Sequence, residues 1–362
     1  MGESMSKEVM KAAVLLGPRN IEVRELPVPK VGVNDVLVKV RACGVCGSDI
    51  AYYRRGRADV PPPIVLGHEF SGTIVELGET AKKLGILKEG DRVVAEPVMA
   101  CGACESCKKG YPNMCEHPTV LGVTVNGGMA EYCLVRYNYL HLIPEKLSFE
   151  EAAFTEPLAC ALNGVRKLKL NPGNSAAVIG PGPIGLMVVQ YLKHSGASPL
   201  ILIGTRDYRL EAGLRLGADY AINVREKDSK YYAEDPVERV KELTDGKGVE
   251  RIFVATGNLE ANQLAVGIGG ARSVTVFFGG AAYEPTHAIS IPLWDSTLGE
   301  KEYVFSWLSP YTFPEALHAI EAGLVDVKPL LTHSFGIEEA GRAIETAEKR
   351  LGNALKVQIK IS

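Results

Sequence analysis

The distribution of apolar residues changes in character part-way along the chain. Before about residue 156, short runs rich in Val and Ile are separated by Gly, Pro and Asn, which is typical of β-strands joined by tight turns. The first part of the chain is therefore predicted to be a β-rich domain. Its clearest strand-like runs are 12–16, 35–42, 70–77 and 92–95.

Beyond residue 156, strand-like runs alternate with segments of helical periodicity. Strand–helix alternation with short connections predicts a parallel, doubly wound sheet covered by helices. The tail returns to mixed structure, so we expect one domain from 1–160 and 305–362 and a second from 161–304. The predicted strands are 176–179, 200–203, 220–223, 251–255, 273–278 and 354–361, and the predicted helices are a segment ending near His194, then 208–216, 237–244, 259–266, 316–323 and 340–349.

Bulk composition restricts the function classes. The chain has 362 residues with a net charge of -3, so charge gives no reason to bind nucleic acid or an anionic membrane. The uncharged stretch 170–192 is long enough to cross a membrane, but its Pro and Gly residues favour a strand, a turn and a buried helix. The first residues, 1–11, lack the apolar segment of a secretory signal, and we expect a cytoplasmic protein.

A glycine-rich turn follows the predicted strand 176–179. Gly180, Gly182 and Gly185 fit the pattern G-x-G-x-x-G, and the turn includes Pro183 and Ile184. After a strand and before a helix, this pattern allows a tight turn, close approach of a pyrophosphate and close helix–strand packing. A simple structural turn is the alternative, but the alternating strands that follow favour a dinucleotide site.

The end of the next strand bears on the choice of dinucleotide. NAD-binding proteins usually place a carboxylate there to bind the ribose hydroxyls. This chain has Gly204, Thr205 and Arg206 instead, with Asp207 at the predicted helix start and Arg209 nearby. A missing carboxylate and an added guanidinium suit a 2′-phosphate, so we predict NADP in preference to NAD. The alternative is that Arg206 is only a solvated residue.

Four of the eight cysteines form a cluster with the spacing C-x2-C-x2-C-x7-C. Four thiolates close a tetrahedral shell around zinc and leave no position for a substrate, which predicts a structural zinc site. An iron–sulfur cluster is the rival, because cysteine quartets bind those as well. The cluster consists of Cys101, Cys104, Cys107 and Cys115.

A second candidate metal site is dispersed along the chain. Cys46, His68 and Glu69, with Glu156 further on, offer a thiolate, an imidazole and carboxylates. Such a set can bind zinc and keep one position open for water or substrate. Taken singly, each residue has a simpler explanation: a small buried thiol, as we expect for Cys43, a core histidine or a solvated acid. The combination favours a catalytic zinc.

These motifs together resemble the medium-chain, zinc-containing alcohol dehydrogenase superfamily over about residues 10–361. The resemblance rests on the segments 46–49 and 67–69, the cysteine quartet and the glycine-rich turn. It implies a GroES-like β-rich catalytic domain interrupted by a Rossmann domain. Glu69 and Glu156 resemble the sorbitol (polyol) dehydrogenase branch, because classical alcohol dehydrogenases use cysteine as the third protein ligand.

The resemblance also implies roles for individual residues. Cys46, His68 and Glu69 would hold the catalytic zinc, and Glu156 would hold its water or exchange with it as a ligand. Ser48 would begin a proton relay, Asp49 would orient His68, and Tyr52 would lie in the substrate pocket. The relay histidine of some relatives is Ala51 here, so the proton would leave by another route.

We therefore expect a hydride-transferring enzyme that acts on a secondary alcohol, a polyol or a sugar, with two zinc ions per chain and no nucleic-acid or membrane partner. L-threonine 3-dehydrogenase, glucose dehydrogenase and simple alcohol dehydrogenase remain alternatives, as does a zinc- and nucleotide-binding protein without catalysis. Relatives are commonly dimers or tetramers, and the apolar strands of 273–291 could pair across a symmetric interface. The segment 277–307 fits the family pattern poorly and could line the pocket or a subunit contact.

Overall fold

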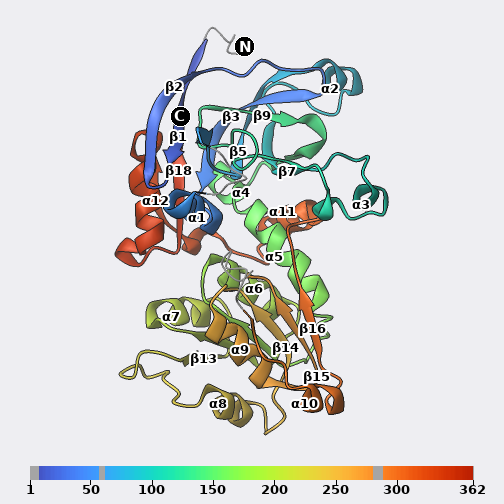
Figure 1. The fold of residues 1–362 in the computed structure, drawn as a ribbon, viewed down its shortest axis with the longest axis vertical. Coiled ribbons are helices and arrows are strands. Elements are labelled where there is room, and N and C mark those ends of the chain that lie inside the picture. Colours follow the sequence, from blue (N-terminus) through green and yellow to red (C-terminus); the bar gives the residue numbers. More distant parts are fainter. Residues whose placement is uncertain (1–7, 57–61, 280–287, 362) are drawn as a thin grey trace. The chain divides into compact units, whose positions relative to one another are not determined.

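The protein, described by a computed structural model over residues 8–56, 62–279 and 288–361, divides into two compact units (Figure 1). The first unit is made of Met1–Pro157, Phe313–Glu321 and Val327–Ser362. The second is made of Leu158–Thr312 and Ala322–Asp326. The chain therefore leaves the first unit after Pro157, returns at Phe313, and passes briefly through the second unit once more at Ala322–Asp326.

The first unit is built on a largely antiparallel sheet of order β10-β6-β5-β3-β18-β17, with β9 also paired to β3, and on a small sheet of order β2-β1-β4. The last strand of the chain, β18, lies beside the early strand β3. The strands are β1 (Val9–Gly17), β2 (Asn20–Pro27), β3 (Asp35–Gly44), β4 (Ile64–Val65), β5 (Glu69–Leu77), β6 (Arg92–Ala95), β7 (Val98–Met99), β8 (Thr119–Val120), β9 (Tyr132–Arg136), β10 (Leu140–Leu142), β17 (Leu331–Gly336) and β18 (Lys356–Lys360).

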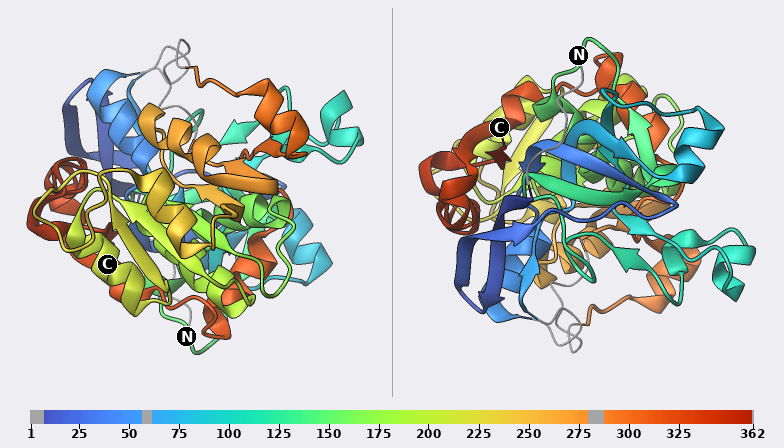
Figure 2. Two further views of the ribbon diagram at one scale, coloured as in Figure 1. Left: turned by 90° about the horizontal axis from the view of Figure 1, so that it is seen from below. Right: turned by 90° about the horizontal axis from the view of Figure 1, so that it is seen from above.

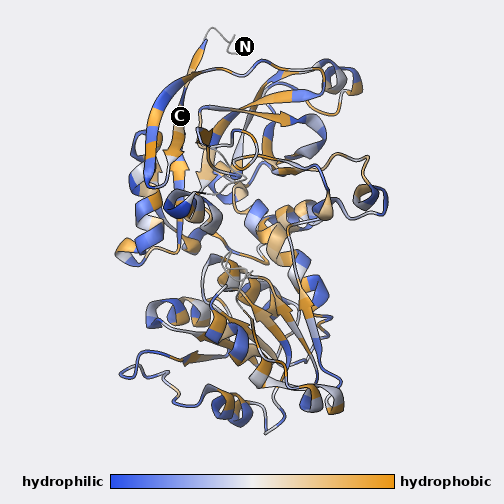
Figure 3. Ribbon diagram, in the orientation of Figure 1, coloured by the Kyte–Doolittle hydropathy of each residue, from blue (hydrophilic) through white to orange (hydrophobic). Residues whose placement is uncertain are grey.

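Strand β3 is buried on both faces over much of its length, which explains its run of Val, Leu and Ala. Its neighbours contribute large buried side chains such as Phe70 and Ile74 to the same core. Figure 3 shows hydrophobic and hydrophilic colours alternating along strands of this unit, most clearly along β2. The helices of the unit are α1 (Gly47–Arg55), α2 (Glu79–Leu84), α3 (Glu105–Lys108), α4 (Phe149–Ala152), the start of α5 (Thr155–Lys167), α11 (Phe313–Glu321) and α12 (Ala340–Lys349).

The second unit contains a six-stranded parallel sheet of order β13-β12-β11-β14-β15-β16. Its strands are β11 (Ala176–Ile179), β12 (Leu200–Gly204), β13 (Tyr220–Asn223), β14 (Val249–Val254), β15 (Gly269–Phe277) and β16 (Glu302–Phe305), and its helices include α6 (Pro183–His194), α7 (Asp207–Arg215), α8 (Pro236–Leu243), α9 (Leu259–Ile268) and α10 (Leu293–Leu298).

Helices cover both faces of this sheet (Figure 2). Helices α8 and α9 pack on the face that carries Ile179 and Ile203. Helices α6 and α7 meet the opposite face, where Leu186 and Leu202 approach Gly213. The predicted doubly wound sheet is thereby confirmed, and strand order reverses between β11 and β14, where such folds place their ligands.

The prediction that 273–291 pairs with another subunit across an interface is wrong for β15, the strand within that segment. Strand β15 is hydrogen-bonded on one side to β14 and on the other to β16, so it has no free edge. Residues 280–287 of that segment lie outside the described residues. The edge of the sheet on this side is β16, which was not predicted as a strand from the sequence, and the opposite edge is β13.

Within the described ranges, no helix has both the length and the apolar character needed to cross a membrane.

Candidate functional site

Two neighbouring strands bring three candidate ligands together in the first unit. Cys46 follows β3, His68 precedes β5, and the antiparallel register places Gly44 opposite Glu69. One ligand atom each from Cys46, His68 and Glu69 lies within 4.8 Å of the others. A thiolate, an imidazole and a carboxylate at that separation form a donor set that zinc accepts, with a fourth position left for another ligand.

Asp49 supports this set from the first turn of α1. Its side chain is completely buried. The carboxylate accepts hydrogen bonds from the backbone N–H of Cys46 at 2.9 Å and of Gly67 at 3.3 Å, and Oδ1 lies 3.7 Å from Nδ1 of His68. Burial raises the pKa of Asp49, an effect opposed by His68 and by these N–H groups. Asp49 therefore links both ligand-bearing segments.

Gly67 is required by the geometry just before His68. Its φ is +91°, and a Cβ here would lie 2.6 Å from Sγ of Cys43 and 2.7 Å from Cγ of Met129. Cys43 is buried, and burial raises the pKa of its thiol well above the ordinary value. Cys43 is therefore the small buried thiol that the sequence predicted.

Glu156 lies at the start of α5, 6% exposed, and its carboxylate is not part of the group within 4.8 Å. Its charge nevertheless acts on the pKa of His68. Burial lowers that pKa, but Cys46, Asp49 and Glu156 outweigh burial and raise it. Glu156 is thus near the three ligands without joining them.

Contacts on α4 fix the chain just before Glu156. Ser148 caps α4 by accepting a hydrogen bond from the N–H of Glu151 at 3.1 Å. Ser71 donates to the carbonyl of Phe149 at 2.6 Å. The guanidinium of Arg92 lies 4.6 Å from the Phe149 ring centre and donates to the carbonyl of Leu147.

Lys356, which sequence reasoning missed, joins the site from the far end of the chain. It is the first residue of β18, and its side chain is 6% exposed. The ammonium forms an ion pair with Oε2 of Glu69 and donates to the carbonyl of Val45 at 3.1 Å. Burial lowers the pKa of Lys356, but Glu69, Cys46 and Glu156 raise it by more.

Two further predicted residues lie on α1. Tyr52 is 3% exposed and belongs to the core of the first unit. Ser48 is partly buried, two residues after Cys46. Ala51, which stands where some relatives have a relay histidine, also lies on this helix.

The four clustered cysteines converge as predicted from their spacing. Their sulfur atoms all lie within 4.8 Å of one another, and Sγ of Cys104 is 4.0 Å from Sγ of Cys115. Tetrahedral zinc with bonds of about 2.3 Å requires sulfurs about 3.8 Å apart, so the cluster fits such an ion. Backbone N–H groups of Ala103 and Cys104 lower the pKa of Cys101 to about 6. Cys107 completes the four.

In the second unit, the glycine-rich turn connects β11 to α6 at the reversal of strand order. Gly180 has φ +102°, and a Cβ here would lie 3.1 Å from Cβ of Thr256, just beyond β14. A Cβ on Gly185 would overlap the carbonyl of Gly180. At Gly182, a Cβ would have only Nη1 of Arg209 nearby, at 3.9 Å. The turn therefore leaves open space beside a guanidinium and the N-terminus of α6, which suits a phosphate. Pro183 and Ile184 open the helix.

The tip of β12 has no carboxylate available for a ribose. A side chain at Gly204 would place its Cβ 2.5 Å from Cγ of Pro181. Asp207 is already engaged, because its Oδ1 accepts from Asn223 at 2.7 Å and from Ser229 at 2.6 Å.

The cations at this tip differ in their contacts. Arg209 lies over the ring of Tyr208 and donates to its hydroxyl at 2.8 Å. No described residue pairs with the guanidinium of Arg206, and Thr205 beside it is exposed.

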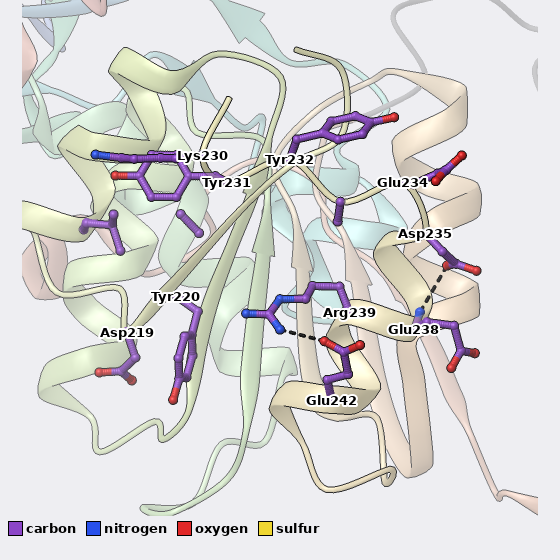
Figure 4. Close-up of a pocket in the computed structure, with 13 residues that line it drawn as sticks. Asp219, Tyr220, Lys230, Tyr231, Tyr232, Glu234, Asp235, Glu238, Arg239 and Glu242 are labelled. Carbon is purple, nitrogen blue, oxygen red and sulfur yellow. Dashed lines mark hydrogen bonds and ion pairs between the residues drawn. The ribbon is translucent and has the colours of Figure 1, made fainter. Parts of the chain in front are cut away.

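A pocket of about 670 Å³ lies elsewhere in the second unit, between β13 and α8 (Figure 4). Tyr220, Tyr231 and Tyr232 line it together with several charged side chains. Many of these charges are already paired, as Arg239 is with Glu242 at 2.6 Å. None of the site residues predicted from the sequence lines this pocket.

Comparisons with known proteins agree with this geometry. Residues 32–145 match the family model of the alcohol dehydrogenase GroES-like domain, and residues 183–322 match that of the zinc-binding dehydrogenases. A sorbitol dehydrogenase from Bacillus subtilis (strain 168) is 34% identical over 357 residues, 97% of either chain.

Two solved structures share the whole fold. A Sinorhizobium meliloti 1021 protein bound to NADP has a TM-score of 0.89 at 29% identity, over 98% of this chain and 100% of that one. The 2R,3R-butanediol dehydrogenase of Bacillus subtilis has a TM-score of 0.86 at 30% identity, with the same coverage.

This chain belongs to the medium-chain, zinc-containing alcohol dehydrogenase superfamily, in its polyol dehydrogenase branch. It is accordingly an NAD(P)-dependent alcohol or polyol dehydrogenase, as its motifs predicted.

Proposed function

We propose that this dehydrogenase oxidises a secondary hydroxyl of a small polyol or sugar to the ketone and passes the hydride to NADP. The observation that carries the proposal is the convergence of Cys46, His68 and Glu69 within 4.8 Å. The similarity to sorbitol dehydrogenase supports the substrate class. Glucose, L-threonine and simple alcohols are the competing substrates.

Cys46, His68 and Glu69 would hold a zinc ion whose Lewis acidity would make an alcohol proton acidic near neutral pH, and a bound dinucleotide would supply the hydride acceptor. Asp49 keeps the imidazole of His68 oriented through its contact with Nδ1. The hydroxyl of Ser48 takes up the substrate proton and passes it toward solvent, and Glu156 offers a second proton acceptor. Tyr52 is proposed to orient the substrate.

The preference for NADP follows from charge at the tip of β12. The 2′-phosphate is a dianion that a carboxylate would repel, and the crowding of Gly204 by Pro181 excludes a side chain there. Thr205, Arg206 and Arg209 are proposed to bind this phosphate, because charge-assisted hydrogen bonds from guanidinium groups are strong.

We further propose two zinc ions per chain, the second held by the four-cysteine cluster in a structural role. Zinc chemistry is assigned to residues 1–160 and 305–362 and dinucleotide binding to residues 161–304. The cytoplasmic location stays a prediction.

An apolar surface on the second unit supports a homo-oligomer, a dimer or a tetramer. Both tryptophans of the chain are exposed there, Trp294 by 77% and Trp307 by 51%, next to the edge strand β16. Phe305 of that strand is 69% exposed. Large apolar groups beside a strand edge favour association with another copy of the chain. Leu293 and Leu298 of α10 and Tyr311 further along the chain are also exposed.

The decisive experiment is a zinc assay combined with initial rates on polyols, sugars, simple alcohols and L-threonine, with NADP and NAD in parallel. We expect two zinc ions per chain and chelator-sensitive reduction of NADP by a polyol. Activity on L-threonine or a simple alcohol alone would replace the substrate proposal. The variant Cys46→Ala should be inactive while it remains folded; near-normal turnover would refute the assignment of the catalytic zinc.

A further inference from the structure

The most unusual charged group of the first unit is a lysine buried against a candidate zinc ligand. The ammonium of Lys356 pairs with Oε2 of Glu69, and their side chains are 6% and 2% exposed. It also donates to the carbonyl of Val45 at 3.1 Å. Burying an ammonium is costly unless partners compensate it, so this placement calls for a functional explanation.

The sheet explains how the two side chains meet. Strand β3 lies between β5, which carries Glu69, and β18, which carries Lys356. Gly44, at the end of β3, stands opposite Glu69 in the register. A Cβ on Gly44 would overlap Oε2 of Glu69 and lie 3.0 Å from Cε of Lys356. The absence of a side chain at residue 44 therefore provides the space in which this ion pair forms.

The single ammonium of Lys356 interacts with more than one anionic side chain. Glu69, the thiolate form of Cys46 and Glu156 all act on its ammonium as anions. Glu69 itself is 1% exposed, and among the described residues the ion pair with Lys356 supplies its positive charge. A buried carboxylate without a counter-charge strongly destabilises a fold.

We propose that Lys356 is an internal counter-ion for Glu69, which neutralises this buried carboxylate before zinc binds and competes with zinc for it once zinc arrives. Lys356 is thus a positioning residue that sets the affinity of the site for zinc. The inference rests on the zinc site proposed at Cys46, His68 and Glu69.

A thermodynamic cycle fixes the sign of the effect. Replacing Lys356 by Met leaves Glu69 without a cation in the zinc-free protein, whereas zinc supplies one in the loaded protein. The zinc-free form is therefore destabilised more than the loaded form, and linkage requires that zinc bind more tightly. Removing a positive charge close to a divalent cation acts in the same direction.

The test compares Lys356→Met, Lys356→Arg and the wild type by thermal unfolding with and without zinc, and by competition with a chromophoric chelator. Lys360→Met is the matched control, because Lys360 lies on the same strand and pairs with Glu150 at the surface. The same titration of Cys46→Ala gives the contribution of the four-cysteine site.

We expect Lys356→Met to lower the melting temperature more without zinc than with it, and to bind zinc about tenfold more tightly. Lys356→Arg, which keeps the charge, should stay close to wild type in zinc affinity, and Lys360→Met should change neither property. If Lys356→Met lowered the melting temperature equally with and without zinc and left zinc affinity unchanged, Lys356 would contribute only to packing. That result would overturn the inference. Weaker zinc binding by Lys356→Met would overturn it as well.

A second variant tests the same geometry without touching a charge. Gly44→Ala should displace Glu69 and weaken zinc binding, whereas Gly17→Ala, where a Cβ meets nothing within 4 Å, should not. Unchanged zinc affinity in Gly44→Ala would contradict the proposed packing. If wild-type protein bound no more zinc than Cys46→Ala, the proposed catalytic zinc site would fail instead, which distinguishes the two proposals.

Discussion

Replacing Asp49 by Asn tests how the buried carboxylate organises the three ligands. The substitution keeps the size of the side chain but exchanges one oxygen for an NH2 group. Asp49 accepts hydrogen bonds from both Cys46 and Gly67, one through each oxygen. Whichever way the amide turns, one backbone N–H then faces another donor.

The magnitude follows from two opposing effects. Losing a hydrogen bond to a charged acceptor costs about 1.5–3 kcal/mol. Removing the charge recovers part of this, since burial already disfavours the ionised form and raises the pKa of Asp49. We therefore expect a loss of about 1–2 kcal/mol in the free energy of unfolding. His68 also loses the anion 3.7 Å from its Nδ1, and such losses typically weaken metal binding about 10–100-fold.

Zinc affinity is measured by chelator competition and stability by urea unfolding of the zinc-loaded protein. Asp91→Asn is the control, because Asp91 likewise accepts a hydrogen bond from one backbone N–H, that of Lys88 at 2.8 Å, in an exposed turn. Both variants should have a lower free energy of unfolding, and only Asp49→Asn should bind zinc more weakly. Wild-type zinc affinity in Asp49→Asn would show that the carboxylate does not organise the ligands.

Three further outcomes are expected. Cys104→Ala should lower the melting temperature by roughly 5–10 °C and release one zinc ion per chain, since structural zinc contributes folding energy; an unchanged melting temperature would exclude the structural role. Arg206→Ser should raise KM for NADP about tenfold or more with little effect on KM for NAD, and Arg215→Ser on the same helix should do neither; an equal change for both dinucleotides would remove Arg206 from phosphate recognition. Trp294→Asp should shift the protein to a smaller species in light scattering, and an unchanged mass would place the interface elsewhere.

Much of the fold was predictable because its signals are local. The parallel strands of the second unit are short apolar runs bounded by turn residues, and β11 and β13 have the predicted limits. The cysteine spacing likewise places four thiols on one loop, and the structure brings their sulfurs together. Short elements with weak periodicity, such as α1 and β16, were missed, because tertiary packing rather than local pattern stabilises them.

The alternation of β18 illustrates the limit of pattern reasoning. Lys356 and Gln358 alternate with Val357 and Ile359, which by itself predicts a polar face exposed to solvent. The structure buries both polar residues, because this face of β18 packs against Glu69 at Lys356 and against α4 at Gln358. Gln358 donates to the carbonyl of Glu150 at 2.8 Å, so its burial is compensated.

The family could be recognised from the sequence alone, and the sequence also predicted the two candidate metal-ligand sets and the candidate dinucleotide turn, because each prediction depends on residue types at short spacing. Only the folded structure shows that Lys356 reaches Glu69, that Gly44 makes room for both, and that β16 rather than β15 forms an edge of the parallel sheet. These features depend on which distant strands become neighbours, and strand order results from the packing of the whole domain, which no short segment of the chain encodes.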